Sequence, residues 1–158
     1  MKKLLFAVLL FACCSKEEPI PEANKRLASA LDSTLQHNYY RLNAYYTLQP
    51  FDYDPTDTVS AKTNHWEYVS WWLKDDEVGF SNNQVTIIQH ANMMPMEMSD
   101  IIYRSYKVRA DSEGVAFDYL NFTYEPLTYR LIEMTDSSLV VKAPYNGTDV
   151  YSIFKVLP

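Results

Sequence analysis

The chain has few of the residues that interrupt strands or crosslink small folds. Its 158 residues include three glycines and two cysteines, and the cysteines are adjacent, at Cys13 and Cys14. A chain of this length buries enough surface to fold without a disulfide. No apolar run approaches the roughly 20 residues that a transmembrane helix needs. The sequence therefore argues against a disulfide scaffold and against membrane-spanning helices.

The chain also lacks a basic excess. It contains 14 Lys and Arg against 20 Asp and Glu, which gives a net charge of −6 at pH 7. Nucleic acids bind to basic patches, so the composition argues against nucleic acid as a partner. Aromatic residues are plentiful at 15% of the chain. Because aromatic side chains favour strands, the composition indicates a β-rich fold.

The N-terminus has the organisation of a secretory signal. A basic start precedes an apolar run over residues 4–12, which is too short to span a bilayer as a helix. A small residue, Ala12, stands directly before Cys13. We therefore expect residues 1–12 to be a signal peptide.

The rest of the chain divides into a short linker and one long segment. Residues 13–21 are charged and contain Pro19 and Pro21, so we expect an extended tether there. Residues 22–158 have a length that suits a single domain.

Leu10-Phe11-Ala12-Cys13 resembles the lipobox of bacterial lipoproteins. The resemblance implies a lipid-anchored protein, with a diacylglyceryl thioether on Cys13. Ser15-Lys16-Glu17-Glu18 resembles the export signal that follows the lipidated cysteine in Bacteroidota-type surface lipoproteins. The distance between cysteine and signal fits Cys14 slightly better than Cys13. We favour Cys13, because a cut before Cys14 would leave a cysteine where a small residue is usual, and we keep Cys14 as the alternative. Together with the lipid anchor, the resemblance to this export signal implies an outer-membrane protein that faces the cell surface.

A single amphipathic helix is predicted near the start of the domain. Leu27, Leu31 and Leu35 recur at every fourth position between about Pro21 and His37, which places them on one helical face. We expect this helix to pack on the outside or over one end of a β domain.

From Tyr39 onward the hydrophobic period changes from about four to two, which is typical of strands. Residues 40, 42, 44, 46 and 48 are expected to share one face of the first strand. Gln49 to Asn64 is expected to be a loop, and Trp66 to Leu73 a second strand. Seven further short strands are predicted between turn signals: Glu77–Ser81, Gln84–His90, Ile101–Arg109, Val115–Tyr124, Leu127–Met134, Leu139–Ala143 and Asp149–Val156.

Eight or nine short strands with tight connections predict a mainly-β fold, an antiparallel up-and-down barrel with one N-terminal α-helix. Asn146-Gly147 is the strongest hairpin signal in the chain. The segments 129–141 and 151–155 resemble the closing strands of bacterial lipocalin-like lipoproteins. That resemblance implies a lipocalin- or calycin-like barrel of about eight strands.

Motifs of enzymes are missing. His37, His65 and His90 are far apart in sequence, and the chain has no Gly-x-Ser-x-Gly elbow and no phosphate-binding glycine loop. We therefore predict no catalytic residue and no cofactor. A hydrolase that uses two of the many acidic residues stays open, because such acids need only spatial proximity.

A methionine cluster is the most unusual local composition. Met93, Met94, Met96 and Met98 follow His90 closely, and thioethers are soft ligands that select Cu(I). The alternative is that these flexible side chains fill irregular space at one end of a barrel. We favour the alternative and predict no metal site.

Four aromatic residues are the predicted ligand contacts: Trp66, Tyr68, Trp71 and Trp72. Aromatic side chains stack on sugars and line apolar cavities, so we expect a small apolar or glycan-like ligand in the barrel. The same residues would equally serve to fill a barrel core. A filled barrel would instead serve as an accessory subunit that binds a protein partner of the outer membrane.

Overall fold

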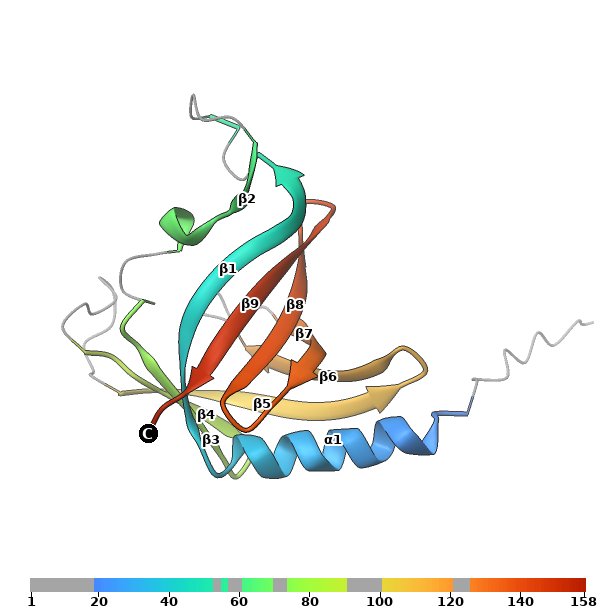
Figure 1. Cartoon of the computed structure of the whole chain (residues 1–158). Coiled ribbons are helices and arrows are strands. Elements are labelled where there is room, and N and C mark those ends of the chain that lie inside the picture. Colours follow the sequence, from blue (N-terminus) through green and yellow to red (C-terminus); the bar gives the residue numbers. More distant parts are fainter. Residues whose placement is uncertain (1–18, 53–54, 57–60, 70–73, 91–100, 121–125) are drawn as a thin grey trace, which may run out of the picture.

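The computed structural model describes residues 19–52, 55–56, 61–69, 74–90, 101–120 and 126–158 (Figure 1). Its elements are α1 (Glu22–Leu35), β1 (Tyr39–Phe51), β2 (Lys62–Asn64), the 3₁₀ turn η1 (Trp66–Tyr68), β3 (Glu77–Ser81), β4 (Gln84–Ile88), β5 (Ile101–Asp111), β6 (Gly114–Leu120), β7 (Pro126–Met134), β8 (Ser138–Tyr145) and β9 (Thr148–Val156).

The strands form one closed antiparallel sheet. Each strand from β3 to β9 pairs with its neighbour in sequence, and β1 pairs with both β3 and β9. Eight strands therefore close into a barrel, while β2 pairs only with β1. This confirms the predicted mainly-β, up-and-down antiparallel barrel with an N-terminal helix, and the closed barrel is consistent with a lipocalin-like fold.

Two tight turns use the left-handed backbone conformation that the sequence indicates. Asn82 and Asn83 have φ angles of 49° and 61° between β3 and β4, and Asn146 and Gly147 have 45° and 80° between β8 and β9. Asparagine and glycine tolerate this region better than other residues, and two successive positive φ values match the twist of the flanking strands. The structure confirms the predicted hairpin at Asn146-Gly147 and shows a second tight hairpin at Asn82-Asn83.

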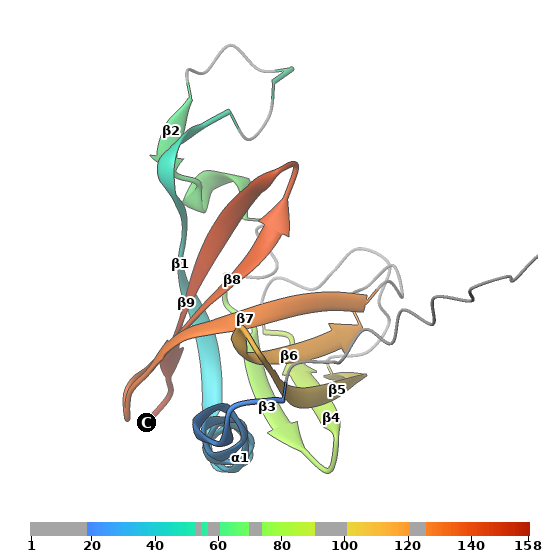
Figure 2. The same cartoon turned by 90° about the vertical axis from the view of Figure 1, so that its right-hand side faces the viewer.

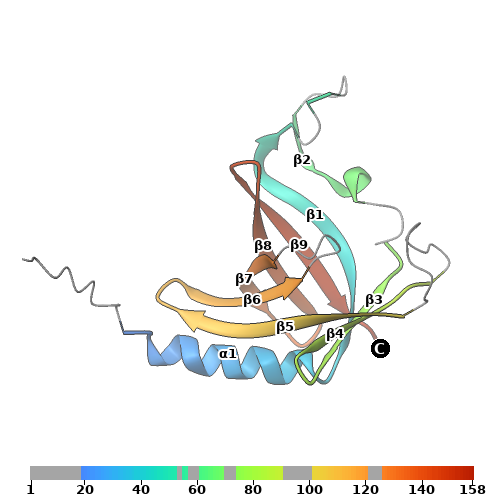
Figure 3. The same ribbon diagram turned by 180° about the vertical axis from the view of Figure 1, so that it is seen from behind.

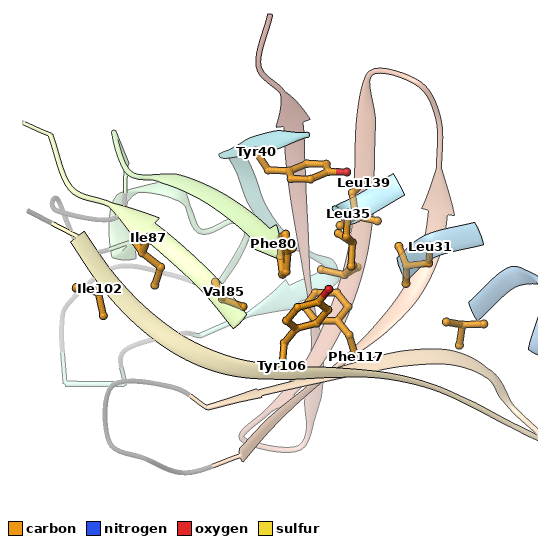
Figure 4. Close-up of a cluster of buried hydrophobic side chains, with 12 residues drawn as sticks. Leu31, Leu35, Tyr40, Phe80, Val85, Ile87, Ile102, Tyr106, Phe117 and Leu139 are labelled. Atoms are coloured by element: carbon orange, nitrogen blue, oxygen red, sulfur yellow. The ribbon is translucent and has the colours of Figure 1, made fainter. Parts of the chain in front are cut away.

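The helix closes one end of the barrel. Leu31 and Leu35 are fully buried and join a cluster of interior side chains that includes Phe80, Tyr106 and Phe117 (Figure 4). The ring centroids of Phe80 and Tyr106 lie 5.1 Å apart, and the Tyr106 hydroxyl donates to Asp32 Oδ1 at 3.0 Å. Figures 2 and 3 show α1 beneath the strands, at the end with the β3–β4 turn. We call this the helix end and the opposite one the far end.

The buried face of α1 is narrower than the sequence suggests. Leu31 and Leu35 are buried as expected, whereas Leu27 remains 41% exposed. The helix contacts β3, β5 and β6. The N-terminal turns instead meet the β5–β6 turn, where Asn24 Nδ2 donates to the carbonyl of Asp111 at 2.8 Å.

A bulge divides β1 into two halves in which the alternation of inward and outward side chains is reversed. Leu42 pairs with Phe154 and Ala44 pairs with Ile153, so Asn43 is an extra residue in the ladder. Because a bulge reverses the alternation of side chains, residues 40, 42, 44, 46 and 48 do not share one face. Thr47 is only 2% exposed whereas Leu48 is 64% exposed, so the prediction is wrong beyond the bulge.

The segment after β1 also differs from expectation. β1 continues to Phe51, which pairs with Lys62 of β2, so the predicted loop from Gln49 to Asn64 is wrong at both of its ends. The predicted strand from Trp66 to Leu73 is wrong over η1, because a hydrogen bond of 3.0 Å from the Tyr68 amide to the His65 carbonyl curls the chain. Residues 70–73 lie outside the described residues.

Candidate functional site

The interior side chains of β3, β4 and β5 form layers that follow from the strand register. Val78, Ile87 and Ile102 make one layer, since Val78 pairs with Ile87 and Ile87 with Ile102. Glu77 pairs with Ile88, so Asp76 and Gln89 occupy the next facing positions toward the far end. Alternation directs both side chains to the interior, and they are only 3% and 4% exposed.

Asp76 and Gln89 have polar atoms that the described residues leave unsatisfied. Neither carboxylate oxygen of Asp76 and neither amide atom of Gln89 has a hydrogen-bond partner within the described parts of the chain. An unsatisfied buried polar group costs about 1–3 kcal/mol, and more when it is charged. Burying the unsatisfied polar groups of both Asp76 and Gln89 therefore lowers the stability of the fold.

The carboxyl group of Asp76 is electrostatically unusual. Burial, reinforced by the neighbouring Asp75, raises the pKa of Asp76 to about 7, while His90 acts in the opposite direction. The group therefore titrates near neutral pH. Groups with strongly shifted pKa values occur preferentially at functional sites.

Charged groups near Asp76 lie on both faces of the barrel wall, with Glu77, Arg41 and His90 on the outer face. Glu77 accepts a hydrogen bond of 2.9 Å from Arg41 Nη2, and its Oε1 lies 3.1 Å from Nε2 of His90. On β5, Arg104 pairs with Val85 and so faces the interior one layer nearer the helix end than Ile102. Its Nη1 donates to the carbonyl of Tyr103 at 3.0 Å.

A second buried polar contact lies where the chain folds back over β1. His65 is fully buried, and its Nε2 lies 3.0 Å from Thr47 Oγ1, whose hydroxyl donates to the carbonyl of Gln49 at 2.6 Å. Thr47 therefore accepts from the imidazole. Burial, with a contribution from Lys62, lowers the pKa of His65. The lowered pKa favours the neutral imidazole, which is the form that shares this buried contact with Thr47.

The predicted aromatic contacts are only partly brought together. Trp66 and Tyr68 lie half-buried in η1, where each is approached by a lysine: Lys74 Nζ lies 5.4 Å from the Trp66 ring and Lys62 Nζ 4.8 Å from the Tyr68 ring. Tyr68 also packs on His65 at 6.2 Å between centroids. Trp71 and Trp72 lie outside the described residues.

Other predicted site residues also fall outside the described part of the chain. These are the two candidate anchors, Cys13 and Cys14, and the methionines Met93, Met94, Met96 and Met98. His90, the fifth candidate metal ligand, is described and lies beside Glu77. Within the described residues no three His, Cys, Asp or Glu side chains are close enough to hold a metal ion. No helix in the described ranges has the length and apolar character to cross a bilayer.

A groove runs over the outside of the barrel near the far end. It has a volume of about 490 Å³ and lies between Leu48 of β1 and Pro144, Asp149 and Tyr151 of β8 and β9. Tyr151 stacks on Tyr46, with ring centroids 5.4 Å apart. Asp149, at the edge of the groove, is paired with Lys142, whose Nζ donates to Asp149 Oδ2.

Comparisons with protein-family models, with curated proteins and with solved structures found no match to this chain. The class of the protein is therefore defined by its architecture: an eight-stranded antiparallel closed barrel with one end covered by an N-terminal helix. An interior of this size is either filled by side chains or holds one small ligand.

Sequence reasoning missed Asp76 and Gln89. A usable signal was present, because both predicted strands β3 and β4 have apolar residues at every second position, and extending that alternation leads to these two polar residues. An aspartate and a glutamine at interior positions are the exception in such a pattern.

Proposed function

We propose that the protein is a lipid-anchored binding protein of the outer membrane that takes a small apolar or glycan-like ligand at the far end of its barrel. One observation carries the proposal: the two ends of the interior differ. At the helix end Leu31, Leu35 and the aromatic cluster fill the barrel, whereas toward the far end Asp76 and Gln89 are buried without partners among the described residues.

The two ends of the interior would both be expected to bury apolar side chains if the barrel bound no ligand. Buried polar groups are normally hydrogen-bonded, and exceptions in native folds call for an explanation. A bound ligand supplies the missing partners. The proposal includes no enzymatic activity, since the sequence contains no recognised catalytic motif.

The lipid anchor belongs to the same proposal and rests on the sequence. Lipidation of Cys13 would hold the protein by several acyl chains, which bind a membrane firmly where one chain does not. The linker 15–21 spans at most about 25 Å, so the barrel would stay close to the membrane surface. Mass spectrometry of the N-terminal peptide tests this: a lipidated N-terminus at Cys13 is expected, and an unmodified cysteine would contradict it.

Ligand capture is tested by native mass spectrometry of the full chain purified gently from its own membranes. We expect a species heavier than the protein by one small molecule, which denaturation releases. Leu31→Ala, at the helix end, is expected to lower stability while leaving the captured molecule the same. Protein that carries no small molecule, and binds none from lipid and glycan mixtures, would contradict the proposal.

The outer groove favours a second function, an accessory subunit that binds a protein partner. Leu48 is 64% exposed beside the stacked pair Tyr46 and Tyr151, and exposed apolar surface often marks an interface. A photo-crosslinking residue in place of Leu48 should then capture one defined protein in intact cells. The matched control is the same residue in place of Ile132, which is 49% exposed on β7.

A further inference from the structure

We propose that the Asp76–Gln89 pair recognises hydroxyl groups of the ligand, so that the barrel selects a glycan-like rather than a purely apolar or a charged molecule. The inference rests on the proposed function and narrows its ligand class. It follows from the hydrogen-bonding capacity of two adjacent side chains and from the charges near them.

The pair presents both acceptors and donors. The Asp76 carboxylate offers two acceptor oxygens, and the Gln89 amide offers one acceptor oxygen and two N–H donors. These are the buried atoms that no described residue satisfies. A purely apolar ligand would bury them further and supply no partner, which is unfavourable.

A ligand cation or anion satisfies the pair less completely than hydroxyls do. An ammonium group has only donors, so it would bind the oxygens of Asp76 and Gln89 and leave the Gln89 N–H groups without an acceptor. An anion would meet the carboxylates of Asp75 and Asp76 in a chain of net charge −6. Neighbouring hydroxyls on a sugar both donate and accept, so they match all the free positions.

The position of Asp76 and Gln89 in the barrel also favours a ligand that carries hydroxyl groups. Asp76 directly precedes β3 and Gln89 directly follows β4, so the register that ends at the Glu77–Ile88 pair, continued by one step, puts them opposite each other. Their side chains then lie one layer beyond Val78 and Ile87. A polar group held at that level would lie above an apolar layer that includes Ile102, which is 3% exposed. The interior thus has a polar level toward the far end and an apolar level beneath it.

Protonation should control this binding. Two hydroxyls donating to one carboxylate need its ionised form, so hydroxyl binding must compete with a proton at Asp76. The charged groups nearby are Asp75 and Glu77 on the β3 side, His90 after β4, Arg41 of β1 on Glu77, and Arg104 of β5 facing the interior. The pKa of Asp76 lies at about 7, so affinity should be about tenfold lower at pH 6 than at pH 8.

The test is an NMR titration of the full chain with three probes that share a four-carbon tail: butyl β-D-glucoside, butylamine and butyrate. We expect the glucoside to bind tightest and to move the side-chain amide signals of Gln89. Asp76→Asn should weaken glucoside binding about tenfold or more and remove its pH dependence. Gln89→Leu should weaken it similarly.

Matched controls sit elsewhere on the barrel. Asp136→Asn changes an exposed carboxylate in the β7–β8 turn, and Gln84→Leu changes an exposed glutamine at the other end of β4. Both should bind the glucoside as the unaltered protein does. Folding of every variant is checked by its methyl spectrum before titration.

The outcomes separate the inference from the proposed function. Tighter binding of butylamine or butyrate than of the glucoside would overturn the hydroxyl assignment alone. Glucoside binding that Asp76→Asn and Gln89→Leu leave unchanged would do the same. Failure of all three probes, and of the lipid and glycan mixtures, would overturn the proposed function and the inference with it.

Discussion

Replacing Asp76 by asparagine should stabilise the protein, and the gain should depend on pH in a defined way. Asp76 is 3% exposed and its carboxylate has no hydrogen-bond partner among the described residues. Its pKa is raised from 3.8 to about 7 on folding, chiefly because burial disfavours the charged form. The folded state therefore holds its proton more tightly than the unfolded state does.

The sign and size of the change in unfolding free energy with pH follow from proton linkage. Below pH 3.8 the carboxyl group is protonated in both states and costs nothing. Between pH 3.8 and about 7 only the unfolded state loses the proton, so the free energy of unfolding falls by about 1.4 kcal/mol per pH unit. Above pH 7 the loss is complete, at about 4 kcal/mol. Asparagine cannot ionise, so the Asp76→Asn variant does not suffer this loss of unfolding free energy.

Urea unfolding of the wild type and of Asp76→Asn, followed by tryptophan fluorescence between pH 4 and 8, measures the effect. The difference in unfolding free energy should grow with pH by about 4 kcal/mol and level off above pH 7. Other carboxylates titrate in both proteins and cancel in the difference. A difference that stays constant over this range would refute the reasoning, because Asp76 would then titrate as an exposed residue does.

Three other substitutions test the packing and the outer ion pairs. Leu31→Ala should destabilise the protein by about 2–5 kcal/mol in urea unfolding, because the side chain is fully buried at the helix end. Gly79→Ala should lower the melting temperature, since its Cβ would lie 2.6 Å from Tyr39 Cε1, and adding Tyr39→Ala should restore most of the loss. Arg130 lowers the pKa of Asp111, so Asp111→Asn should destabilise at neutral pH, with the difference from wild type vanishing as pH falls below 4.

Much of the barrel was predictable because its signals are local. Alternation marked Glu77–Ser81 with the bounds that the structure gives, and Asn146-Gly147 marked a hairpin whose φ values are both positive. Leu31 and Leu35 identified the buried face of the helix. Such signals depend on a few neighbouring residues, so they survive without any knowledge of the tertiary structure.

The errors arose where distant parts of the chain decide the conformation. The bulge at Asn43 is fixed by the pairing of β1 with β9, which lies more than a hundred residues away in sequence. The 3₁₀ turn that begins at Trp66 follows His65, whose amide donates to the carbonyl of Tyr45 on β1 at 2.9 Å and so ties this segment to a distant strand. The alternation that leads to Asp76 was weak evidence by itself, because an aspartate before a strand is ordinarily exposed.

The central claim, that a ligand binds at the far end of the barrel, is tested most directly by the methyl signals of the full chain. Butyl β-D-glucoside should shift the signals of Ile87 and Ile102, which lie beneath the Asp76–Gln89 level, and leave those of Leu31 and Leu35 unchanged. Shifts confined to Ile132 on the outer face, or no shift at any methyl with any of the probes, would contradict the account.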